Sequence, residues 1–320
     1  MKKPIVITAV VLIAVGLALL VYALAASGFD LSKLETEKYS EKTYEVTGDF
    51  ERIEINAKDA FVLLKPSEDG KCRVLCFQRE SLQYSVAADG GTLKIDYKDN
   101  REWYEYLFSE KVQKMTVYLP AESYGSLTVK GGTGGVTIPA GFSFGSIDAG
   151  VSTGEIVCEA SASGAVKLRT STGRIRLRDV TAGSVALSAS TGRIEAYGIT
   201  ANGGFSAEVS TGETLLEDVT CKEFYSKGST GDITLKNVAV AGDMTVERST
   251  GDVEFESCDA ERITVTTSHG DITGTLLTEK RFVAETRVGS VSVPDTENGG
   301  KCVLTTSTGD IEITLANGKR

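Results

Sequence analysis

The sequence predicts an all-β fold: a β-solenoid of about ten turns of 19–20 residues, with an N-terminal β cap and one preceding transmembrane helix. Three observations predict it: a Ser-Thr-Gly motif that returns at a nearly constant interval, apolar residues that alternate within each interval, and an apolar first segment. We call each turn a rung and the glycine of each motif its corner glycine.

The corner glycines are evenly spaced. Complete motifs include Ser171-Thr172-Gly173 and Ser190-Thr191-Gly192, and two degenerate copies surround Gly134 and Gly289. Steps of 19 or 20 residues separate all ten glycines: Gly134, Gly154, Gly173, Gly192, Gly212, Gly231, Gly251, Gly270, Gly289 and Gly309. A constant period of this length indicates a repeat architecture.

Apolar residues recur at fixed offsets from each corner glycine. Val166 and Leu168 precede Gly173 by seven and five residues, and Ile175 and Leu177 follow it by two and four. A spacing of two is that of a strand with one buried face. A rung of two short strands cannot bury that face alone, so rungs must stack, at about 4.8 Å each, into a column roughly 45–50 Å long.

The corner motif has a structural interpretation that needs no ligand. Glycine tolerates a strained backbone without steric cost. We expect the neighbouring serine and threonine hydroxyls to bond the backbone of the turn, or each other from rung to rung.

An uncharged apolar run occupies residues 5–26. At about 1.5 Å per residue it spans a hydrocarbon core of roughly 30 Å. Lys2 and Lys3 predict a cytoplasmic N-terminus, hence a single-pass cell-membrane protein with an extracytoplasmic C-terminal domain. The alternative is a signal peptide cleaved near Ala23-Leu24-Ala25, and the length of the run favours the uncleaved anchor.

Three segments follow the anchor of residues 1–26. Residues 27–43 are predicted to be a charged juxtamembrane tether, 44–120 an N-terminal β cap, and 121–320 the repetitive solenoid. The cap alternates like strands without keeping the repeat, and solenoids need atypical end units to cover their core. We expect the cap to be continuous with the column.

Composition narrows the chemistry. The net charge of -10 argues against nucleic acid, which requires a clustered positive surface. Six cysteines in an exported domain suggest disulfides, but Cys158, Cys258 and Cys302 fall several rungs apart, beyond the roughly 7 Å that bridged Cα atoms allow. Cys72 and Cys76 lie on one predicted strand. We therefore expect small core residues, and no cofactor.

The apolar anchor, Leu31-Ser32-Lys33-Leu34, Val117-Tyr118-Leu119-Pro120 and the tandem Ser-Thr-Gly-Asp-Ile units resemble a bacterial putative-adhesin family, the toast-rack domain of unknown function with its LiaG-like proteins. The resemblance covers nearly all of the exported part. It implies a β-solenoid and a role in adhesion or envelope stress, and it carries no catalytic residues over to this chain.

The residues that follow the corner glycines form one predicted row at the edge of the column. Its first part is expected to pair as opposite charges: Glu155, Arg174, Arg193 and Glu213. Its second part places three carboxylates about 4.8 Å apart, as weak candidates for a calcium or cationic-ligand site: Asp232, Asp252 and Asp271. The competing interpretation is a solvated row in which aspartate suits the turn.

Few other residues suggest chemistry. His269, the single histidine, replaces one motif threonine, whereas a Ser-His-Asp triad needs a base placed between a nucleophile and an orienting acid. Because the nine sibling turns lack a histidine, we interpret His269 as a variant of the turn, and no catalytic residue is predicted. The one dense aromatic cluster holds Trp103, Tyr104, Tyr106 and Phe108. Exposed, it would contact a protein or sugar partner; buried, it would plug the N-terminal end of the core, which we favour.

The leading hypothesis is a non-enzymatic, membrane-anchored scaffold that binds an envelope protein or a wall component, as an adhesin-like module or as part of an envelope-stress system. One alternative is a carbohydrate-active enzyme that acts on wall polysaccharide through the acidic row. Another is a structural surface protein that self-associates through an open C-terminal edge at 311–315.

Overall fold

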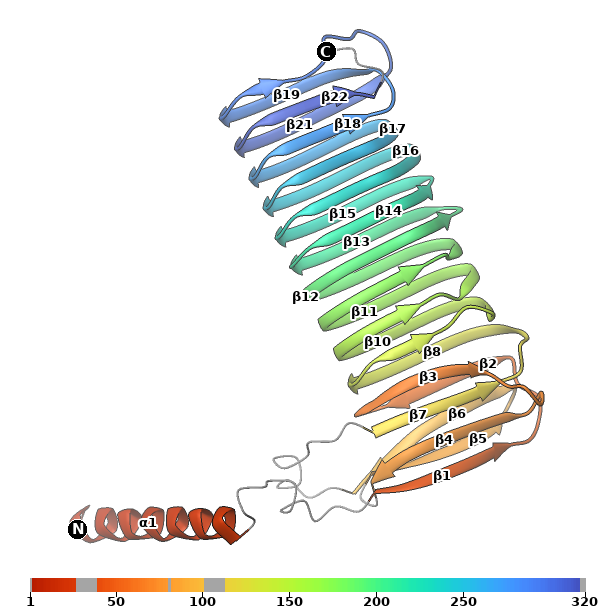
Figure 1. Cartoon of the computed structure of the whole chain (residues 1–320), viewed down its shortest axis with the longest axis vertical. Helices are drawn as coiled ribbons and strands as arrows, with labels where there is room; N and C mark the ends of the chain where they lie inside the picture. The colour runs from red at the N-terminus through yellow and green to blue at the C-terminus, as the bar shows by residue number, and fades with distance from the viewer. Residues whose placement is uncertain (1, 27–38, 80–81, 101–112, 317–320) are drawn as a thin grey trace.

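The computed structural model describes residues 2–26, 39–79, 82–100 and 113–316, which form one helix and one continuous sheet (Figure 1). The helix and the first strands are α1 (Lys2–Ala26), β1 (Tyr39–Val46), β2 (Arg52–Ala57), β3 (Ala60–Pro66), β4 (Cys72–Arg79), β5 (Leu82–Asp89), β6 (Thr92–Asp99) and β7 (Gln113–Leu119). The strands that follow are β8 (Ser123–Thr133), β9 (Val136–Ile138), β10 (Ser143–Cys158), β11 (Ser161–Arg178), β12 (Thr181–Ala201), β13 (Gly204–Thr211), β14 (Thr214–Cys221), β15 (Glu223–Thr230), β16 (Ile233–Thr250), β17 (Val253–His269), β18 (Ile272–Leu276), β19 (Lys280–Val288), β20 (Val291–Ser292), β21 (Gly300–Thr308) and β22 (Ile311–Leu315).

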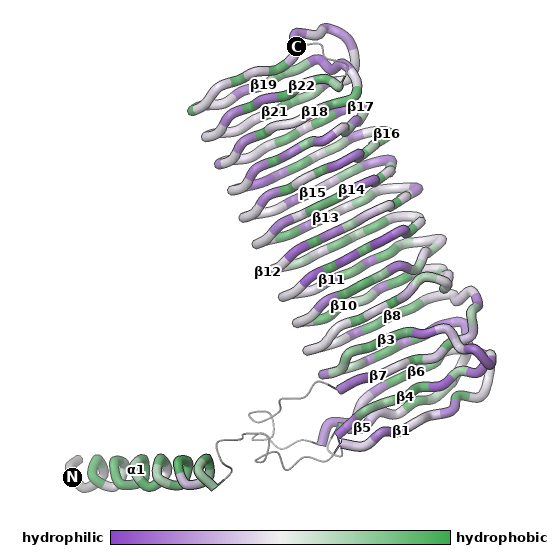
Figure 2. The backbone as a smooth tube through the Cα atoms, viewed as in Figure 1, coloured by the Kyte–Doolittle hydropathy of each residue, from purple (hydrophilic) through white to green (hydrophobic). Residues whose placement is uncertain are grey.

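Helix α1 stands apart from the sheet. Its segment Val6–Ala26 is the one helix in the described chain that is long and apolar enough to cross a membrane, and none of it is buried in the protein. In Figure 2 the backbone of α1 is coloured mostly as hydrophobic residues, whereas the colours alternate along the strands. The buried core extends from Ile53 to Leu315, so the β column is complete without α1 and can fold alone.

The middle of the column stacks rung on rung in parallel register. Gly154 pairs with Gly173, and Gly173 with Gly192, while the motif threonines beside them align in the same way. The predicted β-solenoid of about ten rungs is therefore confirmed. The two walls of each rung are visible as successive slanted strands in Figure 1.

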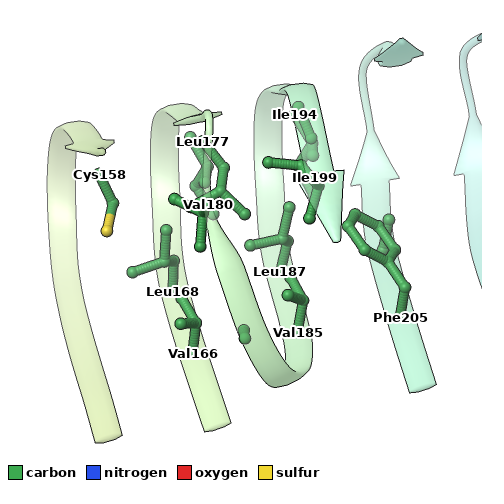
Figure 3. Close-up of a cluster of buried hydrophobic side chains, with 14 of the residues drawn as sticks. Cys158, Val166, Leu168, Leu177, Val180, Val185, Leu187, Ile194, Ile199 and Phe205 are labelled. Atoms are coloured by element: carbon green, nitrogen blue, oxygen red, sulfur yellow. The ribbon is translucent and has the colours of Figure 1, made fainter. Parts of the chain in front are cut away.

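Aliphatic side chains from both walls fill the interior. Val166 and Leu168 from one wall point toward Leu177 and Val180 from the other, and the next rung repeats this arrangement (Figure 3). Burying one such side chain contributes about 1.5–3 kcal/mol, so stacking supplies what a single rung lacks. All six cysteines are buried and free, which confirms that they are core residues: Cys72, Cys76, Cys158, Cys221, Cys258 and Cys302.

A second corner uses the left-handed backbone conformation without depending on glycine. Asp179, Asp218, Asn237 and Ser257, each six residues after a corner glycine, have φ values of 50–57°. Short polar side chains tolerate this conformation because they hydrogen-bond locally. The Asn237 amide donates to Asp218 Oδ1 of the neighbouring rung at 3.0 Å.

At the N-terminal end, one rung is inserted out of chain order. Strand β2 pairs in parallel with both β6 and β8, and β3 pairs with β7 and β9. Ile53 aligns with Leu127 and Val62 with Val136, so Ala60 takes the place of a corner glycine. Strands β4 and β5 then run antiparallel to β7 and β6, and β1 pairs antiparallel with β4.

At the C-terminal end the same inversion occurs. Strand β21 pairs with β17 on one side and β19 on the other, and β22 lies between β18 and β20. The expectation of an open edge at 311–315 is therefore wrong, because the last rung in sequence is the second to last in space. The outer rung is the degenerate one around Gly289.

Polar contacts fix this order. The Lys280 ammonium, at the start of β19, reaches across the inserted strand to Asp259 Oδ1 at 2.7 Å, and Thr278 donates to the same oxygen at 2.8 Å. The apolar offsets are alike in every rung, so they do not specify which rung stacks on which. These contacts were not deducible from the repeat.

Candidate functional site

The Ser-Thr-Gly corner runs along one edge of the whole column. Gly192 has a φ of 140°, and a Cβ there would lie 1.7 Å from the carbonyl oxygen of Gly173. The amide of Gly212 donates to the Thr230 carbonyl oxygen at 2.8 Å, and other corners repeat this bond. Glycine is thus required both by the backbone conformation and by the close approach of the next rung.

The corner hydroxyls do not make the hydrogen bonds that we expected. No motif serine or threonine in the described rungs donates its side-chain hydroxyl to the protein; instead, threonines three residues before the glycine do so. Thr170 donates to the Gly154 carbonyl oxygen at 3.3 Å, and Thr306 to that of Gly270 at 3.0 Å. Nearly all motif serines and threonines are exposed, so their hydroxyls face solvent.

The aspartate row is held by its own backbone. Asp232 Oδ1 accepts the amide of Asp252, Asp252 Oδ1 that of Asp271, and Asp271 Oδ1 that of Asp310, each at 2.8 Å. Asp310 in turn accepts from the Ser290 amide at 2.7 Å, and this bond lowers the pKa of the Asp310 carboxyl.

These bonds favour the turn-stabilising interpretation of the predicted row. Asp232 and Asp252 are exposed and Asp271 is half-buried, and each directs one oxygen at the next rung. Within the described ranges no three His, Cys, Asp or Glu side chains converge as metal ligands. The row also follows the spatial order of rungs, so Asp310 lies next to Asp271 and Ser290 comes last.

The first part of the row pairs as predicted. Arg193 contacts Glu213 of the next rung and Glu195 at 3.6 Å. Arg176 binds Glu195 at 3.1 Å and Glu155 at 3.4 Å, and the bond to Glu195 raises the pKa of the Arg176 guanidinium. Three arginines and three glutamates thus neutralise one another: Arg174, Arg176, Arg193, Glu155, Glu195 and Glu213.

One inward position carries a charge that sequence analysis missed. Arg248 is 5 % exposed and fills the space beside Gly228, where a Cβ would lie 3.0 Å from its Nη1. Its Nη2 donates to Ser226 Oγ and its Nη1 to the Glu247 carbonyl oxygen, both at 2.9 Å. Burial lowers the pKa of the Arg248 guanidinium to about 10. The sequence held one signal for this buried polar site: Ser226 lies five residues before Gly231, a position that is aliphatic in the other rungs.

A groove of about 950 Å³ opens at the N-terminal end of the column. It is lined by residues 45–52, 70–73, 90–91, 120 and 122–124. Phe50, half-buried, stacks on Tyr124 with ring centroids 6.0 Å apart. Burial raises the pKa of the Tyr124 phenol, whose hydroxyl donates to the Pro120 carbonyl oxygen at 2.9 Å.

Charged side chains of both signs surround this aromatic pair. Arg52 is fixed by bonds to Thr92 Oγ1 at 3.0 Å and to the Gly90 carbonyl oxygen at 2.9 Å. The other charged residues of the lining are Glu45, Asp49, Glu51, Lys71, Arg73 and Glu122. An aromatic floor with a charged rim suits a polar partner that also presents an apolar face.

Two predicted sites have different outcomes. His269 is exposed and aligns with Thr250 and Thr308 in the corner row, as a variant of the motif. Trp103, Tyr104, Tyr106 and Phe108 lie outside the described residues, so their role as a plug or a contact stays a prediction.

A parallel column of this kind, with glycine corners and an apolar N-terminal helix, defines a β-solenoid repeat protein. The chain belongs to the Toastrack DUF4097 family, which matches residues 50–203 and 199–320. This confirms the resemblance seen in the repeat. A search of curated proteins found no match.

Several solved structures are similar in part. A putative adhesin from Bacteroides fragilis is 16% identical, with 87% of this chain and 97% of that chain covered and a TM-score of 0.38. A putative adhesin from Parabacteroides distasonis is 14% identical, with 87% and 98% covered and a TM-score of 0.45. A putative lipid binding protein from the same species is 15% identical, with 73% and 96% covered and a TM-score of 0.31.

Proposed function

We propose that this protein is a non-enzymatic scaffold, anchored by α1 and exposed outside the cytoplasmic membrane, that binds another component of the cell envelope. The observation that carries the proposal is the N-terminal groove of about 950 Å³, because it combines aromatic and charged side chains in one hollow. Membership of the Toastrack family and the apolar helix agree with a surface role.

The groove favours a protein or wall component over a small metabolite. Its lining combines the half-buried Phe50 ring with charges of both signs, and it lies where β1 ends and where β2 and β4 begin. Such surfaces recognise extended polar partners by pairing an aromatic anchor with a charged rim. A role in an envelope-stress system is compatible with this: the bound component would report on the envelope.

The test is affinity capture with residues 27–320 immobilised. We expect a defined protein or wall polymer to be enriched from envelope extracts, and Phe50→Ala with Lys71→Glu to reduce its recovery about tenfold or more. Lys71 is exposed, so its reversal changes the groove charge without removing a fold contact. The matched control is Lys301→Glu on β21 at the far end of the column.

Two results would overturn the proposal. One is an envelope extract from which nothing is enriched over a blank matrix. The other is a component captured equally by the wild type, the groove variant and the control. Turnover of a wall polysaccharide that is lost in Asp232→Asn/Asp252→Asn/Asp271→Asn would instead support the enzymatic alternative.

A further inference from the structure

The C-terminal end of the column carries an unpaired edge strand. Among the described residues β19 pairs with β21 alone, and β20 with β22 alone. Val283, next to the central residue of β19, is 53% exposed, and Val288 and Val291 are 61% and 44% exposed. Natural sheets rarely leave an edge of this length uncovered, because its backbone groups pair with other chains.

The direction of the free backbone groups follows from the ladder. The amide of Gly309 donates to the Val288 carbonyl oxygen at 3.0 Å, so Val288 directs its backbone groups toward the inner rungs. The register between β19 and β21 skips Arg287 and Ser307, so the alternation that ends at Val288 does not extend back past Arg287. In the regular ladder from Lys280 to Thr286 the odd-numbered residues face β21, and the even-numbered residues direct their N–H and C=O groups outward, where the Thr296 hydroxyl donates to the Lys280 carbonyl oxygen.

The solvent-facing side chains of β19 carry a pattern of charges that is complementary to an antiparallel second copy of the same strand. From Glu279 to Arg287 every second residue is Glu279, Arg281, Val283, Glu285 and Arg287. A second copy laid antiparallel, with the two-fold axis through Val283, places each Arg281 opposite Glu285 and each Glu279 opposite Arg287. Opposite charges facing each other across strands stabilise pairing.

We propose that β19 is a homotypic docking strand, which pairs antiparallel with β19 of a second copy about Val283. The same register aligns the outward backbone groups as hydrogen-bonded pairs, because even-numbered residues face even-numbered residues. On the inner face it sets Phe282 opposite Ala284, a large side chain against a small one, and continues the core across the junction. Both are only partly covered in the single chain.

Neighbouring registers are disfavoured by like charges. An axis through Ala284 places Arg281 opposite Arg287, and an axis through Phe282 places Glu279 opposite Glu285. Like charges opposite one another destabilise a strand pair. The charges that would blunt this edge against an unrelated strand are therefore matched by a second copy.

This inference rests on the proposed surface function and names a partner for it. The chain enters the column at β1, whereas β19 lies at the opposite end (Figure 1). Pairing through β19 gives a two-fold rod about twice as long, with the two N-terminal helices attached at its far ends. Such a dimer joins two facing surfaces, which makes it a device for homotypic adhesion.

Sedimentation velocity of residues 27–320 tests the pairing. We expect a concentration-dependent dimer whose small-angle scattering gives about twice the maximum dimension of the monomer. Arg281→Glu turns two attractive pairs into two repulsive ones and should raise the dimer dissociation constant about tenfold or more. Glu285→Arg should do the same.

Mixing these two single variants restores complementarity, because the two glutamates of the Arg281→Glu chain then face the two arginines of the Glu285→Arg chain. We expect a heterodimer from the mixture but monomers from each variant alone. Ala284→Pro removes an outward amide and should abolish the dimer with an unchanged far-ultraviolet spectrum, whereas Lys167→Glu, an exposed change on β11 in the middle of the column, should leave it intact.

A wild type that stays monomeric at all accessible concentrations overturns the docking strand, as does a mixture that fails to recover the dimer. Neither result touches the groove, because envelope capture is read with Phe50→Ala and Lys71→Glu at the other end. Equally, a failed capture experiment leaves the sedimentation result intact. The two proposals therefore fail separately.

Discussion

The middle of the column and its two ends are built from the same rungs but are ordered differently. From β10 to β17 the rungs stack in the order of the chain. At each end one rung is inserted between two that are neighbours in sequence: β2 and β3 at the N-terminal end, β21 and β22 at the C-terminal end. The backbone spacing and the apolar offsets are the same in both regions.

This difference shows that the apolar interior of a rung makes it stack on another rung, but does not determine the order in which the rungs stack. Every rung offers aliphatic side chains at the same offsets, so any rung can rest on any other. Order is imposed by short connections in the middle and by particular polar contacts at the ends, above all Lys280 with Asp259. Substitutions in the backbone corners that all rungs share should therefore destabilise the whole column. Substitutions in the Lys280–Asp259 contact, which we call the clasp, should act only at the C-terminal end.

The largest effect is expected from the corner glycines of the middle. Gly192→Ala would place a Cβ 1.7 Å from the Gly173 carbonyl oxygen at a φ of 140°, so the rungs must separate. We expect a loss of about 4 kcal/mol or more in unfolding free energy, measured by denaturant titration, or no folded protein. Gly150→Ala is the control: its Cβ would meet nothing nearer than 3.8 Å, and a small change is expected.

The second effect should be confined to one end. Deleting residues 300–320 removes β21, the partner of β19, so the outer rung loses its support. We expect amide exchange in residues 280–292 to accelerate about a hundredfold or more while β10 to β16 keep their protection. Retained protection in 280–292 would mean that β19 restacks directly on β17 and that the clasp does not set the order.

A smaller, local effect is expected from the clasp itself. Burial raises the pKa of the Cys302 and Cys158 thiols to about 12, so labelling at pH 8 requires opening of the rung. Lys280→Met leaves Asp259 without its buried cation, at a cost of about 2 kcal/mol, and should speed labelling of Cys302 about thirtyfold.

The matched readout is Cys158, which lies in the middle of the column and should label at an unchanged rate. The matched variant is Lys301→Met, an exposed change on the same inserted strand. If Cys158 accelerates as much as Cys302, the clasp supports the whole column and the contrast between middle and ends is lost.

Sequence reasoning reached the repeat but not its exceptions. Corner glycines, alternating strands, buried free cysteines and the Arg–Glu pairs all follow from a period of 19–20 residues, because stacked rungs turn a period into a spatial ladder. The inserted rung around Ala60 escaped since alanine replaces the glycine there. Arg248 escaped because only the structure places it beside the space that Gly228 leaves.

The candidate sites were less accessible still. The groove combines residues 45–52, 70–73, 90–91, 120 and 122–124, which the inverted order brings together and no periodic pattern marks. The edge strand β19 was misplaced for the same reason: the expectation assumed that the last rung in sequence is the outermost. Both errors arise because the segments that connect the rungs follow the repeat less strictly than the buried positions inside the rungs.

The smallest effects are expected from the exposed residues that follow the corner glycines. The salt dependence of stability should distinguish the Arg–Glu part of this row from its aspartate part. Arg193→Ala removes attractions to Glu195 and Glu213, worth about 1 kcal/mol or less. Thermal melting should show that this loss is smaller in high salt than in low salt, because salt screens the ion pairs that stabilise the wild type.

Asp252→Ala should respond in the opposite sense. It removes an acceptor for the Asp271 amide, but it also removes a carboxylate that repels its neighbours Asp232 and Asp271. At low salt the relief of repulsion offsets part of the lost hydrogen bond, whereas high salt screens the repulsion and leaves the loss of the bond exposed. The destabilisation should therefore grow with salt. If it shrinks as in Arg193→Ala, repulsion between neighbouring aspartates does not weaken the row, and the expected contrast between its two parts is lost.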